Sequence, residues 1–402
     1  MPIWLLGLLF AAFVFFTDDY IIAGVLPEIA ADLAVSEAAA GQLVTAFSLT
    51  VALGAPVAAV VLARWPRRLL FGAALAIFAA ANTAAALTTS FELLMAVRVL
   101  AAAAAAMATP ALFAAAAALA PAGRQGAYIG TVALGVTGSI AVGVPLGTWI
   151  GGLLDWRATF AAMAGAGVVA LVWLAAALPE AEPPAPVPLR DQVRILASGP
   201  VLLGLLANAL TVTGSMMLLT YLAPFSAALA EVDTETRAAL FAASGFAGML
   251  GIRLGGTATD RWGPDRTFAA GVGVFVTVMA VFTVLWPLRP VALWIIGPLA
   301  VVWGGAAFWN SPAVQARLLS LAGPAGPQAL AVNTGFTNVG VAVGGALGGV
   351  LLSTAGIGWL APVSALLGLL ALGAFRLAAP ARTRAEGPRP STGPSRNAPN
   401  QP

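Results

Sequence analysis

Residues 93–118 read LLMAVRVLAAAAAAMATPALFAAAAA, an apolar stretch interrupted only by the charge of Arg98. The hydrocarbon core of a bilayer is about 30 Å thick, and an α-helix needs about 20 mostly apolar residues to cross it. The stretch is long enough and apolar enough to predict a transmembrane helix.

Stretches of similar length and composition recur along the whole chain of 402 residues. Hydrophobic residues make up 60% of the sequence and charged residues 9%, whereas about a quarter of the residues in a typical soluble protein are charged. We therefore predict an all-α polytopic membrane protein with twelve transmembrane helices. The expected spans are 4–26, 38–63, 69–87, 93–118, 127–150, 157–178, 200–223, 238–258, 267–286, 291–312, 328–352 and 359–378.

The first six spans and the second six repeat each other at a constant offset of 197 residues. The matching pairs include Pro27 and Pro224, Gly54 and Gly251, Arg64 and Arg261, Trp65 and Trp262, and Phe71 and Phe268. Two parallel halves of this kind place a binding site between them, near the middle of the membrane. We predict an N-terminal half at 1–178, a proline-rich cytoplasmic linker at 179–200, a C-terminal half at 201–378 and a disordered cytoplasmic tail at 379–402.

Several residue types are absent, which narrows the possible functions. The chain has no cysteine and no histidine, and all 19 basic residues are arginine. Disulfides, Cys/His metal sites and a Walker A lysine are therefore excluded. We expect no bound metal, no other cofactor and no enzymatic activity. The net charge is only +3 and the arginines form no stripe, so nucleic-acid binding is not expected either.

The arginines also predict the orientation of the chain in the membrane. Most of them fall in the connections of one side, whereas Arg157, Arg237 and Arg289 fall on the other side. Because arginine is enriched in cytoplasmic connections, we predict that both termini are cytoplasmic. We expect the protein in the plasma membrane, which is the inner membrane in a cell that also has an outer membrane.

Two connections at equivalent places in the repeat carry related motifs. The second reads GTATDRWGPDR at 256–266, and the first reads VLARWPRR at 61–68. With these motifs the chain resembles the major facilitator superfamily, in particular its twelve-span drug:proton antiporters (chloramphenicol- and multidrug-efflux-like exporters), whose loop reads G-x-L-A-D-R-x-G-R-R. The resemblance covers all twelve spans and implies a conformational latch, although Ala63 replaces the aspartate in the first copy. The latch residues are Arg64, Arg67, Arg68, Asp260, Arg261 and Arg266. A basic turn that only sets the topology is the alternative.

The fifth span carries Gly138 and, further on, the sequence GVPLG at 143–147. This sequence resembles the antiporter motif G-P-x-x-G-G of the exporters, with Val144 in place of the glycine before the proline. The resemblance implies an export role for Gly138, Gly143, Pro145 and Gly147. Glycines at such spacing also let another helix approach closely, so ordinary packing is the alternative.

Four charged residues lie inside the expected spans, away from the span ends: Asp18, Asp19, Arg98 and Arg253. A charge at the middle of a bilayer costs on the order of 3 kcal/mol, so it needs a partner or a function. At 1.5 Å per residue, Asp19 and Arg98 lie about 10 Å and about 8 Å from the outer ends of their spans. We therefore expect a pair between Asp19 and Arg98, in the first and fourth spans.

The resemblance extends to these charges. Thr17-Asp18-Asp19-Tyr20 stands where related exporters show T-S-E-F, and Arg98 matches an arginine that the family uses in proton coupling. Our hypothesis is that Asp19 carries a proton, with Asp18 as a secondary acid or a contact for a cation. A dry site favours the neutral carboxyl, and a nearby guanidinium or water favours the charged one, so rocking of the halves would load and unload the proton. A static ion pair that only fixes helix packing is the alternative.

The expected function is proton-coupled export of small hydrophobic drug-like molecules or natural products by alternating access, by a monomer in the lipid bilayer. An exporter of sugars or other metabolites is the alternative within the same fold. A membrane receptor or a membrane enzyme is disfavoured. In the superfamily, helices 1, 4, 7 and 10 line the cavity. The substrate-binding candidates are Tyr20, Asn208, Thr211, Asn310, Trp309 and, in span 11, Asn338, with Phe47, Trp303 and Phe308 as further aromatic walls.

Overall fold

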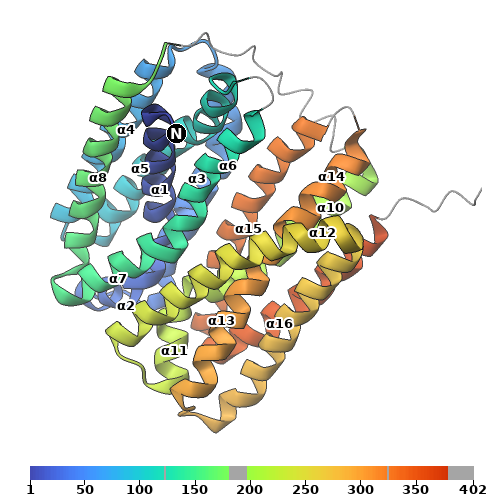
Figure 1. Cartoon of the computed structure of the whole chain (residues 1–402). Helices are drawn as coiled ribbons and strands as arrows, with labels where there is room; N and C mark the ends of the chain where they lie inside the picture. Colours follow the sequence, from blue (N-terminus) through green and yellow to red (C-terminus); the bar gives the residue numbers. More distant parts are fainter. Residues whose placement is uncertain (122–123, 181–196, 324–325, 379–402) are drawn as a thin grey trace, which may run out of the picture.

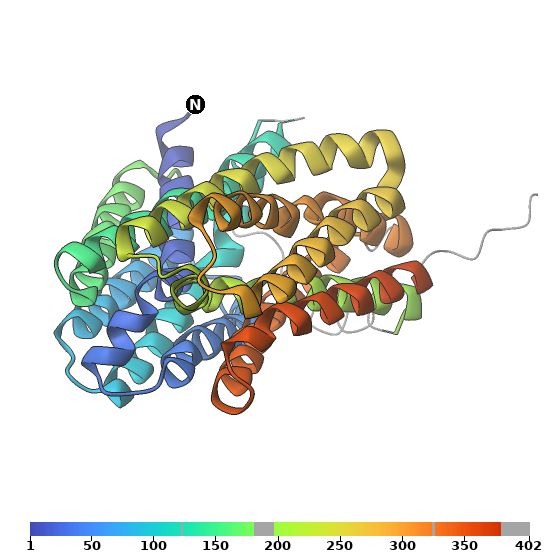
Figure 2. The same cartoon turned by 90° about the horizontal axis from the view of Figure 1, so that it is seen from below.

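The structure, a computed structural model, describes residues 1–121, 124–180, 197–323 and 326–378. The secondary structure of this part is helical (Figures 1 and 2). The elements of the first half of the chain are α1 (Ile3–Tyr20), α2 (Ile22–Asp32), α3 (Glu37–Val61), α4 (Arg67–Leu87), α5 (Phe91–Ala118), α6 (Gln125–Gly138), the π-helix η1 (Ser139–Gly143), α7 (Val144–Leu153) and α8 (Trp156–Ala177). Those of the second half are α10 (Gly199–Thr220), α11 (Leu222–Ala230), α12 (Thr234–Leu285), η2 (Trp286–Leu288), α13 (Leu293–Trp309), α14 (Ser311–Ala322), α15 (Gly326–Thr354), η4 (Ile357–Trp359) and α16 (Leu360–Leu377).

Eleven helical segments of the described residues are long enough and apolar enough to cross a membrane. The longest of them, Thr234–Leu288, has room for two crossings because the backbone turns at Gly263, whose φ of 78° and ψ of 164° are not helical. Glycine adopts a positive φ without the steric cost of a Cβ atom. With this division the fold is the predicted all-α membrane bundle.

The bend at Gly263 forms the connection between the eighth and ninth spans. The spans predicted from the sequence, 238–258 and 267–286, left residues 259–266 between them. In the structure these residues are helical on both sides of Gly263 and belong to α12. The chain changes direction at one glycine, and Pro264 follows at the start of the next helical stretch, where its missing N–H costs little.

The first and seventh spans are each broken into two helices. α1 gives way to α2 at Ile21, and α10 gives way to α11 at Tyr221. Pro27 and Pro224, which correspond in the repeat, lie in the second helix of each pair. Proline has no N–H for the helical hydrogen bond and its ring crowds the carbonyl four residues earlier, so it weakens the helix just before it. Both spans extend beyond their predicted ends, to residues 32 and 230.

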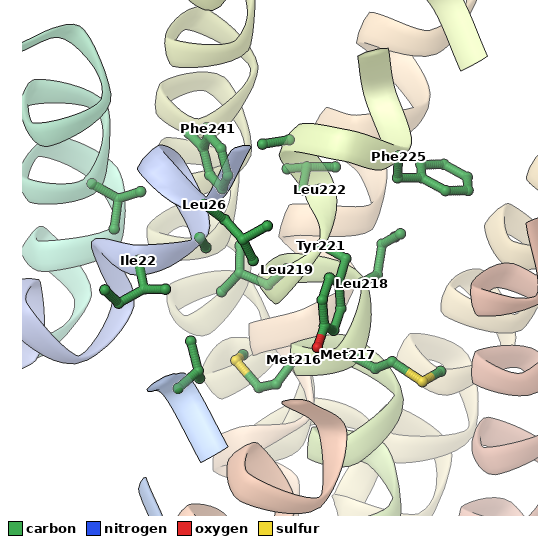
Figure 3. Packing of buried hydrophobic residues seen from close by; sticks show 14 of the residues in the cluster. Ile22, Leu26, Met216, Met217, Leu218, Leu219, Tyr221, Leu222, Phe225 and Phe241 are labelled. Atoms are coloured by element: carbon green, nitrogen blue, oxygen red, sulfur yellow. The ribbon is translucent and has the colours of Figure 1, made fainter. Parts of the chain in front are cut away.

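Two groups of helices, α1–α8 and α10–α16, lie side by side (Figures 1 and 2). Each group has its own buried apolar cluster, and a third cluster is shared between them. Figure 3 shows part of the shared cluster, where Ile22 and Leu26 of α2 face Leu219, Leu222 and Phe241 of the second group. The predicted tail at 379–402 and most of the predicted linker at 179–200 lie outside the described residues.

The two groups touch near one end of the molecule. Gly345 of α15 packs against Thr45 of α3. One and two turns further along α3, Leu49 and Leu53 are 44% and 65% exposed. α3 is therefore packed against α15 in its first half and exposed in its second. The contact lies toward the end opposite the N-terminus (Figure 1).

Candidate functional site

Asp18 and Arg98 form a buried ion pair between α1 and α5. Arg98 Nη1 donates a hydrogen bond to Asp18 Oδ2 at 2.6 Å, and Nη2 donates to the carbonyl oxygen of Asp18 at 2.6 Å. The two side chains are 0–1% exposed. The guanidinium carbon lies 4.4 Å from the ring centre of Phe47 and 5.7 Å from that of Phe160. Arg98 is thus held by charge-assisted bonds and by aromatic faces.

Asp19 lies next to this pair but faces α3. Its Oδ1 accepts a hydrogen bond from Ser48 Oγ at 3.1 Å, and the residue is 3% exposed. The expected pair of Asp19 with Arg98 is therefore wrong, because the partner is Asp18. Consecutive residues of a helix point about 100° apart, so only one of the two aspartates can face α5. The single charge of Arg98 compensates one of the two carboxylates.

The glycines of the predicted antiporter motif pack against the helix that carries both aspartates. Gly143 lies against Thr17, and Gly147 lies against Ile21, so close that a Cβ atom at either glycine would collide. A Cβ atom at Gly138 would make only ordinary contact, 3.6 Å from the nearest side-chain atom of α1. The motif therefore sets the distance between the fifth span and α1 within one group of helices.

The same span contains a π-helical turn. The N–H of Val144 bonds to the carbonyl oxygen of Ser139, five residues earlier, instead of the usual four. Pro145 follows and has no N–H to offer to the carbonyl oxygen of Ala141. Single π turns inside α-helices are often found at functional sites. This one ends at Gly143, which packs against Thr17 of α1.

The predicted latch residues lie around the junction of α3 with α4 and around the bend in α12. Arg68 Nε donates to the carbonyl oxygen of Leu178 at 2.8 Å. Near the bend, Asp265 forms an ion pair with Arg317 of α14. Both contacts join helices of the same group, and sequence reasoning did not single out Asp265 or Arg317 as a pair. Arg67 is buried, whereas Arg64, Asp260, Arg261 and Arg266 are exposed.

Most of the predicted substrate-binding residues use their hydrogen-bond donors within the protein, either to a neighbouring helix or within the same helix. Asn208 Nδ2 donates to Thr337 Oγ1 at 2.9 Å, and Trp309 Nε1 donates to the carbonyl oxygen of Thr267 at 3.0 Å. Three further donors bond to a carbonyl one turn earlier in the chain: those of Thr211, Asn310 and Asn338. Tyr20 is partly buried at the end of α1. These bonds stabilise the helices and leave few groups for a ligand.

A small cavity lies between the two groups of helices, at a different place. Its lining residues are Ile140 of η1, Ser215, Met216 and Leu219 of α10, Ser244 of α12, and Trp303, Gly304, Ala307 and Phe308 of α13. Sequence reasoning had named Trp303 and Phe308 as aromatic walls but missed Ser215. The spacing of Asn208, Thr211 and Ser215, at i, i+3 and i+7, places them on one face of α10 and could have pointed to it.

An ion pair joins the two groups where they touch. Arg237 of α12 donates to Glu28 Oε1 of α2 at 2.6 Å, and the side chains are 8% and 25% exposed. Asp233 nearby caps α12 by accepting the N–H of Thr236 at 2.8 Å. Hydrogen bonding from the Thr236 side chain, together with this backbone bond, lowers the pKa of Asp233. Sequence reasoning had used Arg237 only to orient the chain. Arg237 also lines an open pocket of about 750 Å³.

Comparison with known proteins identifies the family. The family model described as Major Facilitator Superfamily matches residues 8–326. The chain belongs to the Major Facilitator Superfamily. It is 34% identical over 397 residues to a chloramphenicol resistance protein of Streptomyces lividans. This match covers 95% of this chain and 96% of the relative. It is 27% identical over 368 residues to a probable sugar efflux transporter of Helicobacter pylori strain G27. This match covers 90% of this chain and 91% of the relative.

The fold of this superfamily member also matches solved structures. A bacterial homologue of the human lysosomal transporter Spinster, in an inward-facing and occupied conformation, has a TM-score of 0.73 at 17% sequence identity. The match covers 93% of this chain and 96% of that one. The resemblance stated from the motifs is thus confirmed. Membership makes the protein a multi-pass membrane transporter of small molecules rather than an enzyme.

Proposed function

We propose that this transporter exports small, mostly apolar molecules in exchange for protons. The observation that carries the proposal is the charge balance of the buried group on α1. Two adjacent carboxylates, Asp18 and Asp19, are 0% and 3% exposed, and the guanidinium of Arg98 bonds to the first of them. An uncompensated carboxylate is costly in such surroundings. A proton on Asp19 removes that cost.

The proton is gained and lost as the two halves rock about their contact. When Asp19 is sealed from water, the neutral carboxyl is the favoured form. When water reaches it from the cytoplasmic side, the carboxylate forms and the hydroxyl of Ser48 stabilises it by a hydrogen bond. Proton binding from outside drives the return to the inward-facing form, and proton release inside lets the next substrate bind and be carried outward. Residues 1–178 and 201–378 act as the two moving halves of one monomer, with both termini in the cytoplasm.

The motif residues have supporting roles in this proposal. Gly143 and Gly147 keep the fifth span close to the helix that carries the aspartates, and Gly138 and Pro145 belong to the same motif. The predicted latch holds the cytoplasmic ends of the two halves together in the conformation in which those ends meet. Its residues are Arg64, Arg67, Arg68, Asp260, Arg261 and Arg266. Charge-assisted bonds between helix ends suit this task because they can form and break without moving the apolar core.

Two relatives bear on the substrate. The name of the Streptomyces lividans relative, chloramphenicol resistance protein, supports a drug-like substrate. The name of the Helicobacter pylori relative, probable sugar efflux transporter, supports the alternative of sugar export. The cavity between the helix groups has mainly apolar lining residues. Because drug sites are mostly apolar with a few polar groups, the lining favours the first substrate class.

The experiment is substrate flux in proteoliposomes under an imposed pH gradient. We expect the wild-type protein to move chloramphenicol against its gradient only when the proton gradient is present. The Asp19→Asn variant should lose this accumulation, because its side chain cannot release a proton, while it still equilibrates the substrate.

The matched control is Glu92→Gln, which makes the same chemical change at an exposed residue at the start of α5. It should behave like the wild type. Full coupling in the Asp19→Asn variant would rule out the proposed carrier. Flux of glucose but not of chloramphenicol would favour the sugar exporter.

A further inference from the structure

The cavity between the helix groups contains two buried hydrogen-bond donors that are not used by the protein. Ser215 is 1% exposed and Trp303 is 2% exposed. Among the described residues, neither Ser215 Oγ nor Trp303 Nε1 has a hydrogen-bond partner. Both residues line the same cavity, from α10 and α13 respectively. Buried polar groups are nearly always paired in folded proteins, so two unpaired donors in one cavity need an explanation.

A third polar residue in the cavity provides the contrast. Ser244 also lines it, but its Oγ donates to the carbonyl oxygen of Ala300 at 3.1 Å. The hydroxyl of Ser244 therefore joins α12 to α13, and it is satisfied without a ligand. Ser215 and Trp303 gain no such packing bond, and an unpaired buried donor lowers stability. Their donors are suited to a partner that comes from outside the chain.

The chemistry of the lining defines that partner. An indole N–H can only donate a hydrogen bond, and a serine hydroxyl can donate one. The other walls are apolar, with Met216 and Phe308 among them, and no charged residue belongs to the described lining. We infer that this cavity is a substrate subsite for neutral, partly aromatic molecules that carry a hydrogen-bond acceptor such as a carbonyl, amide or nitro oxygen. The inference rests on the proposed export function and names its substrate class.

The lining disfavours the two other obvious substrate classes. An organic cation needs a carboxylate or several aromatic faces to replace its water, and the described lining has no carboxylate. A sugar needs a polar partner for most of its hydroxyl groups, because each unpaired one is costly when buried. Two free donors satisfy only one or two groups. A molecule with a large apolar body and one acceptor fits better.

The position of the cavity explains how it could admit a molecule larger than water. In this conformation its volume is about 10 Å³. That is room for about one water molecule. Its wall from the first helix group is Ile140 of η1, and the other lining residues belong to the second group. Separation of the two groups therefore removes one wall and enlarges the site.

The test measures binding of chloramphenicol, a neutral nitroaromatic amide, to the purified full-length protein by calorimetry. Ser215→Ala and Trp303→Phe each remove one donor and should raise the Kd about 3- to 10-fold. The matched controls are Ser364→Ala and Trp173→Phe, which remove donors already bonded to backbone carbonyls away from the cavity. The controls should leave the Kd within about twofold and lower the unfolding temperature. Ser215→Ala should keep or raise that temperature, because its hydroxyl has no partner to lose.

Two further probes test the substrate class: tetraphenylphosphonium, a hydrophobic cation, and glucose. We expect both to bind at least about tenfold more weakly than chloramphenicol. An unchanged Kd in both donor variants, or tighter binding of either further probe, overturns the subsite. These outcomes are separate from failure of the proposed function. If chloramphenicol binds through Ser215 and Trp303 but its flux ignores a pH gradient, the subsite stands and the proton coupling fails.

Discussion

Removal of the Asp18 carboxylate tests the assignment of the two adjacent aspartates. In the Asp18→Asn variant, Arg98 keeps its charge in a site where both side chains are 0–1% exposed. Breaking a buried ion pair by removing one partner costs about 3–5 kcal/mol, because the other charge is left uncompensated. In Asp19→Asn, the amide oxygen can still accept the hydrogen bond of Ser48 and no charge loses its partner. The expected change is therefore within about 1 kcal/mol.

Thermal unfolding of the purified variants measures this difference. The unfolding entropy scales with chain length, so for 402 residues about 1 kcal/mol shifts the midpoint by about 1 °C. We expect Asp18→Asn to fall by about 4 °C and Asp19→Asn to stay within about 1 °C of the wild type. The double variant Asp18→Asn with Arg98→Leu should recover most of the loss, because replacement of a whole buried pair by uncharged groups is often nearly neutral.

Transport under a pH gradient should show the reverse order. Asp19→Asn should lose proton coupling with an intact fold. The Asp18 and Arg98 double variant should keep some coupling, if Asp19 alone carries the proton. The reasoning is refuted if Asp19→Asn destabilises the protein as much as Asp18→Asn does, or if the double variant is no more stable than Asp18→Asn.

Three further predictions concern the contact between the helix groups. Arg237→Gln breaks the ion pair with Glu28, which is worth about 1.5–3 kcal/mol as a charged hydrogen bond. The outer ends of the two helix groups should then lie further apart. Spin labels on two introduced cysteines measure this distance, and the chain has no native cysteine to interfere. Gly245→Val places a side chain against the backbone of Ala141, where there is no room for one, and overpacking costs about 1–3 kcal/mol; transport should fall while the protein still inserts and folds. Tyr221→Phe removes a 2.9 Å hydrogen bond to a buried carbonyl of α15 and should lower the unfolding midpoint by about 1–2 °C; an unchanged midpoint would contradict a structural role for that hydroxyl.

Much of the fold follows from local properties of the sequence. Apolar runs of about 20 residues predict membrane helices without any knowledge of their partners, because lipid imposes the same requirement on each span. The repeat of Pro27 at Pro224 and of Arg64 at Arg261 predicts related halves in the same way. The connection between the eighth and ninth spans is shorter than predicted, because a single residue with positive φ leaves the helical pattern on both sides intact.

The candidate site is only partly visible in the sequence. Asp18, Asp19 and Arg98 stand out because charges are rare in apolar spans. The depth of a residue in the membrane follows from its position in the span, at 1.5 Å per residue. This estimate places Arg98 at nearly the same depth as the aspartates. Which aspartate faces Arg98 depends on the rotation of α1 about its own axis relative to α5. That angle is set by packing against several neighbours, including Gly143 and Gly147.

The sequence by itself determined the class of the protein. It is a twelve-span transporter with two adjacent aspartates in its first span and an arginine partner in its fourth span. Only the tertiary structure decided the partners, namely Asp18 rather than Asp19 for Arg98, Asp265 for Arg317, and Glu28 for Arg237. It also separated Ser215, whose hydroxyl is free, from Ser244, whose hydroxyl is bonded. The physical reason is that insertion into lipid depends on each segment alone, whereas hydrogen bonds and ion pairs depend on the rotation and distance of two packed helices.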